Sequence, residues 1–536
     1  MEEPFHKIFN TCGPCHPSRH LTVPAVDRAP LARQMVEDGV SFCLKGPRRS
    51  GKTTLALELA GEITGCGRYH ALYMTLQEAR GARGRRQGAR LFAEALNSAL
   101  RAHRDPMLSA LSVPLDADTS PRHSARKVLE RLCSALDRPL VLFIDEADML
   151  SGDALQSLLD QLTAGMALAA GRPEAFPRCV GLLALPAPDR LPSTAGAGAR
   201  KAALPGERGR AEGLLAAAAS LCREIRLPAF TFAELDRLCE LHGAGSGQAV
   251  EEAAKLRLWD WTAGAPWPVN AIMAEAVDSV LHGDRGSPVT EAAVDEAARS
   301  LLRSTPAPLR RLGGLLSGLP VRRACCEALC GGNAGEALSG GGAELAAELG
   351  LLSAGLDDRL RPAGLLCRAI ILRELASHIR LPAGLRGLCP GKGGGPDMTA
   401  ALLEFQRLWR WRAASWREPL ADIPGAGEKL SLLAFLEAAL PEGYGLEATP
   451  SAAEGSLAVT VAGPDKPLPL LIALERPGGP GHQGRLQDLS ALMHAAGSGE
   501  GWLAFFDLDP AKGPDERIFW KTRPLAAGSV AHVAGL

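Results

Sequence analysis

The chain contains the stretch Gly46-Pro47-Arg48-Arg49-Ser50-Gly51-Lys52-Thr53, which fits the phosphate-binding loop G-x-x-x-x-G-K-[ST] at every fixed position. An apolar run, Val40 to Leu44, precedes this loop, and a helix-favouring run, Thr54 to Ala60, follows it. A strand, then the loop, then a helix is the context in which the motif binds phosphate rather than matching by accident. We therefore predict a nucleotide-binding α/β fold built around these residues.

The residue types of this loop suit a nucleoside triphosphate. Its glycines let successive backbone N–H groups and the helix N-terminus converge on phosphate oxygens. Lys52 is expected to reach the β- and γ-phosphates, and Thr53 to offer its hydroxyl to Mg²⁺. The predicted nucleotide contacts in the loop are Gly46, Pro47, Arg48, Arg49, Ser50, Gly51, Lys52, Thr53 and Thr54.

A second stretch supplies the acids that ATP hydrolysis needs. Leu140 to Ile144 is apolar throughout and ends in Asp145 and Glu146, a pattern typical of a strand buried on both faces. At the carboxyl end of such a strand, we expect Asp145 to hold Mg²⁺ through water and Glu146 to polarise the attacking water. The alternative is that both acids only cap the next helix. We favour catalysis because the first motif lies upstream, and we predict Lys52, Asp145 and Glu146 as catalytic residues, Thr53 and Asp145 as metal ligands, and ATP and Mg²⁺ as cofactors.

Length and composition narrow the class of protein. A chain of 536 residues is too long for one core, and typical domain sizes suggest about three or four domains. Lys and Arg number 59 and Asp and Glu 60, so any attraction to nucleic acid must be local. No apolar run approaches the roughly 18 to 20 residues of a membrane span, and the start lacks a signal-peptide pattern, so we expect a cytoplasmic protein with no membrane partner. The thirteen cysteines are scattered through apolar runs, which suits reduced core thiols.

The N-terminal leader carries the sequence CGPC at Cys12 to Cys15, as thioredoxin-type redox centres do. Such a centre needs a buried strand before it and a helix after it to lower the thiol pKa, whereas polar residues precede this stretch and prolines follow it. A zinc site made by Cys12, Cys15, His16 and His20 is another alternative, but the spacing matches no usual ligand pattern. We favour a structured leader that packs near the nucleotide.

Three further apolar runs complete the predicted parallel sheet. We expect strands at residues 70–76, 179–185 and 223–230, the last at an edge. Between the last two, from Pro186 to about Ala219, the composition lacks an apolar period and predicts a mobile loop. Thr231 and Glu234 then have the spacing of a helix capping box, and helices are expected over about 231–303.

An arginine cluster follows the 70–76 strand. Its members could contact the phosphates of a nucleic acid, but a charge run is usually a solvated helix face, which we favour. The cluster consists of Arg80, Arg83, Arg85, Arg86 and Arg90.

Four elements occur in a fixed order along residues 8–300: Phe9-Asn10-Thr11 through His20, GPRRSGKTT at 46–54, VLFIDEAD at 141–148 and WTAGAPWPVN at 261–270. This ordered set resembles a bacterial AAA-like ATPase family related to the STAND NTPases. The resemblance implies that Gly264-Ala265-Pro266 presents a helical lid to the nucleotide, with Pro266 as a further predicted contact. The alternative is an ordinary helix break.

Residues 304 to about 390 predict a smaller helical module. Glu344 to Leu352, followed by Leu360-Arg361-Pro362, is similar to the recognition helix and wing of a winged helix, with a glycine at the helix end. Such a module could read DNA. Because this helix offers acids rather than arginines at its centre, we favour a packing module that relays the nucleotide state.

The last region follows a glycine-rich linker, Gly391 to Pro396, and opens with an amphipathic helix from Leu402 to Arg412. This helix mixes tryptophan and arginine, which can bind nucleic acid, yet rings at helical spacing are more often core. Strands at 456–461, 470–475 and 501–507 follow.

This tail resembles a PD-(D/E)XK nuclease fold. The chemistry of that fold needs an aspartate on one strand and Glu-x-Lys on the next to hold metal and activate water. The matching positions here are Ser456, Ala473 and Glu475, so the metal-binding set is missing, although a shifted register could recruit Glu454 with Glu475. The resemblance therefore implies a fold kept without cleavage.

The whole chain thus predicts an α/β P-loop NTPase with appended modules. We expect a leader at 1–35, the ATPase core at 36–230, a helical lid at 231–303, a winged-helix-like module at 304–390 and an α+β nuclease-like domain at 398–536. The expected function is a Mg²⁺-dependent ATPase that acts as a nucleotide-driven switch or remodelling module on a protein or nucleic acid, with a homo-oligomer as an open option. The alternatives are a nucleic-acid-processing ATPase with an active nuclease and a nucleotide-gated scaffold with negligible turnover.

Overall fold

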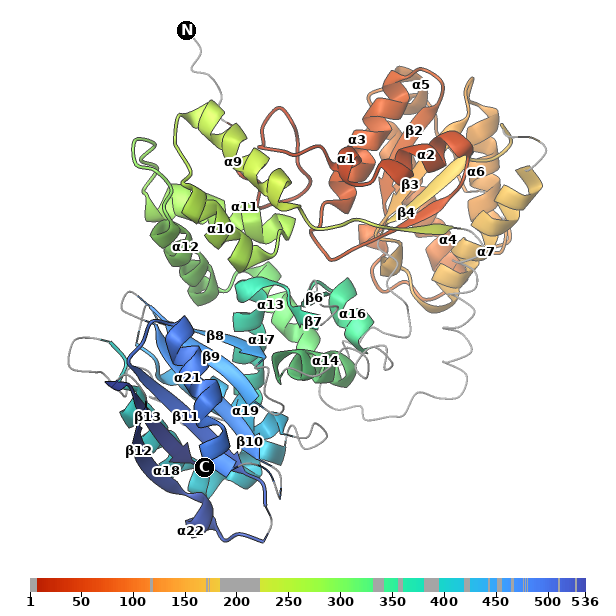
Figure 1. Cartoon of the computed structure of the whole chain (residues 1–536). Helices are drawn as coiled ribbons and strands as arrows, with labels where there is room; N and C mark the ends of the chain where they lie inside the picture. The colour runs from red at the N-terminus through yellow and green to blue at the C-terminus, as the bar shows by residue number, and fades with distance from the viewer. Residues whose placement is uncertain are drawn as a thin grey trace. The chain divides into compact units, whose positions relative to one another are not determined.

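A computed structural model describes most of the chain (Figure 1). The chain divides into two compact units. The first unit comprises Met1–Val250, Gly264–Ala274 and Arg285–Pro288; the second comprises Glu251–Ala263, Glu275–Asp284 and Val289–Leu536. The loop predicted at 186–219 and linker residues 391–394 lie outside the described residues. Those described are 7–115, 119–169, 172, 174–183, 222–330, 342–354, 360–379, 395–418, 425–441, 444–450, 456–463, 467–475, 477, 479, 481–509, 511–525 and 528–536.

The first unit is built on a five-stranded sheet in the order β2-β3-β4-β1-β5. Every neighbouring pair is parallel, and β5 lies at an edge next to β1. The predicted α/β parallel fold is therefore confirmed, with each predicted strand present. The strands are β1 (Phe42–Lys45), β2 (His70–Thr75), β3 (Leu140–Asp145), β4 (Cys179–Leu183) and β5 (Arg223–Arg226).

Helices cover both faces of this sheet (Figure 1). Along β3, Val141 and Phe143 join one buried cluster, while Leu142 and Ile144 join the other. This two-residue alternation between two apolar layers explains why β3 is continuously apolar. One layer holds α1 (Ala25–Arg28), α2 (Pro30–Asp38) and α3 (Lys52–Gly65); the other holds α4 (Arg85–Arg101), α5 (Pro106–Ser109), α6 (Ser124–Ser134) and α7 (Gly152–Leu168), with short turns η1 (Gln77–Ala79) and η2 (Ala147–Met149).

The arginine cluster lies on the surface of this unit. All five side chains are exposed, and the last three lie on α4. Arg90 pairs with Glu94 at 2.8 Å, and Arg85 approaches Asp153 to 3.6 Å. This is the solvated helix face that the charge run predicts.

The first unit ends in helices that follow β5. α9 (Phe232–Ser246) begins with the predicted capping box, in which Thr231 and Glu234 exchange backbone and side-chain hydrogen bonds. α11 (Pro266–Glu275) begins directly after the predicted break, where Gly264 has a φ of 73°. A positive φ here favours glycine, which explains why the break needs this residue.

The N-terminal part of the second unit is helical. Asp295 accepts hydrogen bonds of 2.6 Å from both Arg257 and Trp261, which joins α10 (Glu252–Thr262) to α12 (Glu291–Ser304). The helix predicted at 344–352 is observed as α16 (Gly342–Glu348), and β6 (Leu352–Ala354) pairs antiparallel with β7 (Leu360–Pro362). A helix and hairpin thus occupy the positions of the predicted recognition helix and wing. The remaining elements are η4 (Ala276–Val280), α13 (Ala307–Gly314), η5 (Leu315–Ser317), α14 (Leu319–Cys330) and α17 (Gly364–Ile379).

The C-terminal part is a six-stranded mixed sheet in the order β12-β13-β11-β10-β9-β8. α18 and α19 pack on one face through a cluster that includes Phe405, Phe435 and Phe506, and α21 packs on the other face. The elements are α18 (Met398–Arg417), α19 (Ala426–Ala439), β8 (Gly445–Pro450), β9 (Ser456–Ala462), β10 (Leu468–Glu475), α20 (Gly481–Gly484), α21 (Leu486–Ala495), β11 (Glu500–Asp507), α22 (Pro514–Arg517), β12 (Phe519–Pro524) and β13 (Val530–Gly535).

The tryptophans of α18 divide between core and surface. Trp409 and Trp416 are buried, which confirms the core interpretation for these two rings, but Trp411 is 81% exposed. In the described part of the chain, no helix is long and apolar enough to cross a membrane.

A glycine in β4 sets the contact between the strands that carry the two sequence motifs. A Cβ atom on Gly181 would lie 2.8 Å from the Phe143 ring and 3.1 Å from the Phe42 ring. Because Gly181 has no side chain, Phe42 of β1 and Phe143 of β3 meet over β4 with ring centroids 6.3 Å apart.

Replacing this glycine should therefore destabilise the first unit. We expect Gly181→Val to lower the free energy of unfolding by about 1 to 3 kcal/mol, the usual cost of overpacking a core. The control is Gly61→Ala on the exposed side of α3, where a Cβ meets nothing within 4 Å. That change should be neutral or stabilising because alanine favours helix. Thermal unfolding measures both; a Gly181→Val protein as stable as wild type would contradict this packing argument.

Candidate nucleotide-binding site

The predicted loop joins β1 to the N-terminus of α3. Gly51 is the residue before α3 and has a φ of 100°, which favours glycine, and a Cβ there would lie 3.3 Å from the Arg28 guanidinium. The Ser50 side chain is buried, and its Oγ has no hydrogen-bond partner among the described residues. The loop therefore has the curled backbone that phosphate binding requires.

Lys52 lies inside the curled loop. Its side chain is only 8% exposed, and Nζ donates hydrogen bonds of 2.7 Å to the carbonyl oxygens of Gly46 and Pro47. Burial lowers the pKa of Lys52 to about 8, and the nearby Asp145 carboxylate partly opposes this shift. A buried ammonium held by two neutral carbonyls would gain strongly from an anionic phosphate.

Asp145 lies at the carboxyl end of β3 and is oriented by three donors. Thr53 Oγ1 donates to Asp145 Oδ2 over 2.6 Å, and Tyr73 Oη donates to the same oxygen over 2.9 Å. The other carboxylate oxygen accepts the backbone N–H of Glu146 at 2.8 Å. Burial, helped by the Asp145 charge, raises the pKa of Tyr73 well above its usual value, so its hydroxyl stays a donor.

Glu146 follows directly and has a strained backbone. Its φ of 54° is in the left-handed region, which costs a residue other than glycine on the order of 1 kcal/mol. Its Oε2 accepts a hydrogen bond from Thr75 Oγ1 at 3.1 Å. Thr75 pairs with Asp145 across β2 and β3, so the two acids and their hydroxyl partners share one edge of the sheet.

Arg48 links the loop to the turn that follows Asp145. Its guanidinium lies 3.7 Å from the carboxylate of Asp148. Burial raises the pKa of Asp148, while Arg48 acts in the opposite direction.

The leader lies against the loop, as the sequence predicts. The carbonyl oxygen of Thr11 accepts hydrogen bonds of 3.0 Å from both Arg49 and the indole of Trp267, and the Arg49 guanidinium lies 5.4 Å from that ring. The backbone N–H of Cys15 donates to Thr54 Oγ1 at 3.1 Å. Pro266 begins α11, and it is its neighbour Trp267 that lies against Arg49 of the loop.

Arg28 is a supporting residue that sequence reasoning missed. Its buried guanidinium donates to the carbonyl oxygen of Ser50 at 3.2 Å and to that of Pro228, and lies 4.8 Å from the Phe230 ring. Burial lowers its pKa. Phe230 in turn donates to the carbonyl oxygen of Gly264 at 2.8 Å. Arg28 therefore ties the loop to the chain that leads towards α11.

The residues present fit ATP with Mg²⁺. Thr53 and Asp145 offer hydroxyl and carboxylate oxygens, the ligands that Mg²⁺ prefers when substrate phosphates complete its shell. In the described part of the chain, no group of three or more His, Cys, Asp or Glu residues is arranged to hold a metal ion by itself. The leader residues Cys12, Cys15, His16 and His20, considered above as a zinc site, therefore form no such group.

One family model matches the segment that contains the loop and β3. Residues 37–176 match the family model described as AAA domain. This segment is an AAA-type P-loop ATPase domain. No curated protein matches the chain.

The chain is also similar to solved structures, three of which follow. The Walker-type ATPase PABY2304 of Pyrococcus abyssi is 14% identical, with coverage of 68% of this chain and 99% of that chain and a TM-score of 0.43. The RuvB Holliday junction branch migration motor of Thermotoga maritima is 16% identical, with coverage of 63% and 89% and a TM-score of 0.32. Cdc6p from Pyrobaculum aerophilum is 14% identical, with coverage of 67% and 96% and a TM-score of 0.34.

The lowered pKa of Lys52 predicts a pH dependence. Lysine is charged below its pKa, so the free protein should lose the Lys52 charge as the pH rises through about 8. Because kcat/KM reports ionisation of the free protein, kcat/KM for ATP should fall above that pH. The matched control is Lys52→Arg, which keeps its charge and should show no such fall, whatever its rate. Wild-type and Lys52→Arg profiles that decline together would contradict the assignment to Lys52.

Proposed function

We propose that the chain is a Mg²⁺-dependent ATPase that acts as a nucleotide-driven switch or remodelling module. The observation that carries this proposal is the 2.6 Å hydrogen bond from Thr53 to Asp145. This bond joins the last residue of the phosphate loop to the carboxylate at the end of β3. ATP hydrolysis needs these two motifs together at one site.

The side chains divide the chemistry between them. Lys52 would stabilise the negative charge that grows on the transferred phosphoryl group. Glu146, next to Asp145, would orient the attacking water and take up its proton as the bond from the γ-phosphorus to the bridging oxygen breaks. Mg²⁺, when bound, supplies charge neutralisation on the phosphates. Asp145, fixed by Thr53 and Tyr73, needs no reorganisation before it meets the metal.

Contacts around the loop support a switch. Thr11 joins Arg49 of the loop to Trp267 of α11, and Arg28 joins Ser50 to the chain after β5. A change in loop conformation on ATP binding or hydrolysis would therefore act on α11, which supports the lid role that the resemblance implies. We further propose a cytoplasmic protein related to the STAND NTPases whose partner is a protein or a nucleic acid.

We propose that the tail keeps a nuclease-like fold without activity. β8, β9 and β10 are antiparallel, and β11 returns parallel to β10 after α21. Ser456 and Ala473, at the positions where that chemistry needs carboxylates, pair directly across β9 and β10 and are both buried. Neither can hold a metal ion as a carboxylate does.

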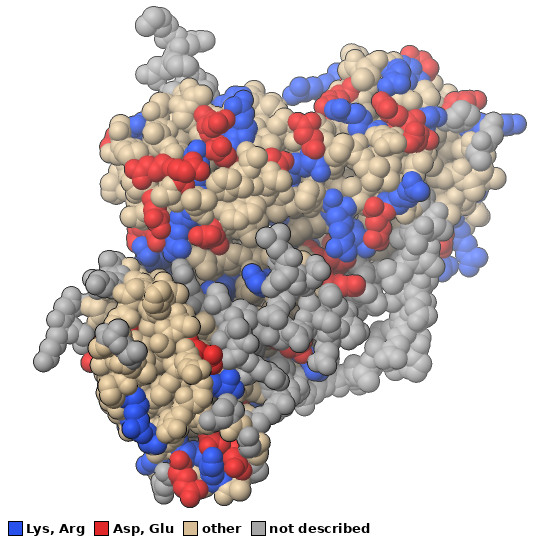
Figure 2. Space-filling view, viewed as in Figure 1, with Lys and Arg blue, Asp and Glu red and all other residues tan. Residues whose placement is uncertain are grey.

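Two acids near these positions, Glu475 and Asp507, each pair with a cation. Glu475 lies 3.5 Å from the Arg485 guanidinium. Asp507, which pairs with Glu475 across β10 and β11 and which sequence reasoning missed, accepts a 2.6 Å hydrogen bond from Lys512. Glu454, the residue of the shifted register, lies outside the described residues. Among the residues coloured in Figure 2, Lys and Arg are interspersed with Asp and Glu and form no broad basic face on the side shown.

Substitutions in the loop and at β3 test the ATPase proposal. Lys52→Ala should lower turnover about 10²-fold or more, the scale for one preorganised electrostatic group. Glu146→Gln should bind ATP while hydrolysis stops. Steady-state phosphate release and equilibrium ATP binding measure the two effects. Equal rates in wild type and both variants would contradict the site, and wild-type ATP binding without turnover would favour the nucleotide-gated scaffold.

Incubation with nucleic acid tests the tail. The full chain with ATP should leave linear, circular and single-stranded DNA and RNA intact in Mg²⁺ or Mn²⁺, since the carboxylates of Glu475 and Asp507 each pair with a cation. The control is Glu475→Ala. Cleavage by the wild type that disappears in Glu475→Ala would show an active nuclease and overturn this assignment.

A further inference from the structure

The leader forms a closed loop whose tip carries the CGPC sequence. Ile8 and His20 form a β-bridge at its base, where Leu21 donates to the carbonyl oxygen of Ile8 at 2.9 Å. Between them the backbone bends at residues 12–14, with a φ of 70° at Gly13. Cys12 and Cys15 are therefore held on one tight turn. Within the described residues 7–24, neither a strand before this turn nor a helix after it gives the setting of a thioredoxin-type catalytic centre.

One amide group braces both cysteines. Asn10 Oδ1 accepts the backbone N–H of Cys12 at 3.0 Å, while Asn10 Nδ2 donates to the carbonyl oxygen of Gly13 at 3.2 Å and to Cys15 Sγ at 3.4 Å. Because these contacts start from one side-chain amide, they confine Cys12 and Cys15 to its immediate surroundings. A disulfide needs Cβ atoms about 3.8 Å apart, a separation that a C-x-x-C turn can reach.

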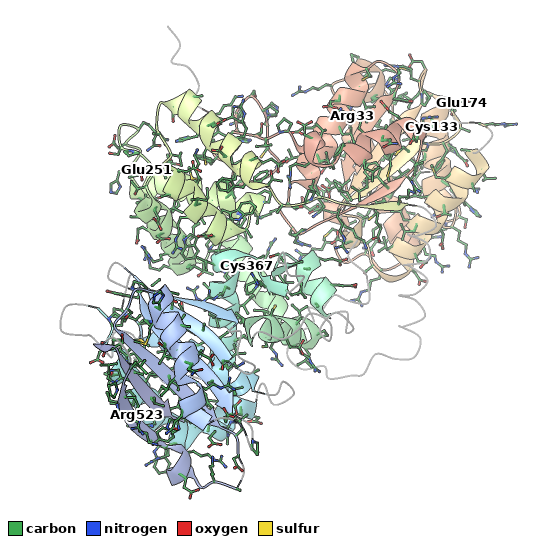
Figure 3. All side chains as sticks on the ribbon, viewed as in Figure 1. Arg33, Cys133, Glu174, Glu251, Cys367 and Arg523 are labelled. Atoms are coloured by element: carbon green, nitrogen blue, oxygen red, sulfur yellow. The ribbon has the colours of Figure 1, made fainter. Side chains whose placement is uncertain are left out.

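The two thiols differ in exposure. Cys12 is exposed and Cys15 is half-buried, while structural thiols such as Cys133 and Cys367 lie buried in the cores (Figure 3). Burial raises the pKa of Cys15. The accessible Cys12 is therefore suited to attack an oxidant, and Cys15 to resolve the product.

We propose that Cys12 and Cys15 form an oxidisable dithiol, and that their disulfide loosens the hold of the leader on the phosphate loop and on α11. The oxidant is a small-molecule disulfide. The Cys12 thiolate attacks one of its sulfurs, the S–S bond breaks, and one thiolate leaves and takes up a proton. Cys15, on losing its proton, attacks Cys12 Sγ and expels the second thiol, so two protein thiols are oxidised and one small disulfide is reduced to two thiols.

The contacts of this turn transmit the change. Bonding to Cys12 requires Cys15 Sγ to leave Asn10 Nδ2, which removes the brace between residues 10 and 15. The same two residues hold the leader in place. Asn10 N donates to Asn270 Oδ1 at 3.2 Å, and Cys15 N donates to Thr54 Oγ1 at 3.1 Å. The functional effect rests on the proposed ATP site, because ATP affinity is where it would be measured.

Mass spectrometry tests whether the disulfide forms. Trypsin should release residues 8–19 as one peptide that contains Cys12 and Cys15 and no other cysteine. After full-length protein is equilibrated in glutathione buffers from reducing to oxidising and its free thiols are alkylated, this peptide should appear unalkylated and lighter by two hydrogen atoms. A peptide that stays fully alkylated, or carries only glutathione, would overturn the proposal.

Binding tests its effect. Oxidation should weaken binding of a fluorescent ATP analogue about tenfold, the scale of one lost hydrogen bond, and a reductant should reverse it. Cys12→Ala keeps the contact between Asn10 and Cys15 Sγ but cannot close the disulfide, so it should bind like reduced wild type and not respond to oxidation. Cys66→Ala is the matched control for an exposed thiol elsewhere and should respond like wild type. Unchanged affinity in oxidised wild type would overturn the proposal.

Hydrogen exchange without nucleotide separates this proposal from the proposed function. Amides of residues 49–55 and 267–271 should exchange faster in the oxidised wild type but not in Cys12→Ala after the same oxidation. If the reduced protein fails to bind ATP but oxidation still speeds exchange at these amides, the assignment of the ATP site is wrong and the leader switch stands. Unchanged exchange in a protein shown to carry the disulfide would contradict the switch.

Discussion

The hydrogen bond between Thr53 and Asp145 is the interaction on which the site depends. This bond requires the carboxyl ends of β1 and β3 to lie at the same end of the sheet, although β4 lies between the two strands. Parallel pairing aligns those ends, and Gly181 of β4 lets Phe42 and Phe143 make contact across it. Apolar packing in the middle of the sheet thus helps to position the polar contact between Thr53 and Asp145 at the carboxyl ends of the strands.

The electrostatics of the site favour a bound anion. Burial lowers the pKa of Lys52 to about 8, although two carbonyl oxygens hold its ammonium group. A phosphate would reverse that desolvation penalty by pairing with the charge. The leader and Arg28 surround the same loop with contacts to its outer residues, so a change at the phosphate position has physical routes to α11. The oxidisable turn at Cys12 and Cys15 lies on one of these routes.

The sequence predicts the parts of this structure that depend on local pattern. The loop from Gly46 to Thr53, the apolar strand before Asp145 and the cap at Thr231 each follow from spacing and residue type, and each is observed. Tyr73, Arg28 and Asp507 were missed because their roles come from partners distant in sequence: Asp145, Ser50 and Glu475. The spacing of apolar residues in α18 likewise predicts that Trp409 is buried, but it does not predict that Trp411 is exposed.

The central claim is that Thr53 and Asp145 belong to one ATP and Mg²⁺ site. Calorimetric titration of ATP into the wild type and into Asp145→Asn, each in Mg²⁺ and in EDTA, tests it most directly. The account predicts that Mg²⁺ tightens ATP binding by the wild type and that Asp145→Asn loses this gain while still binding ATP through the loop. The same Mg²⁺-dependent gain in both proteins would contradict it.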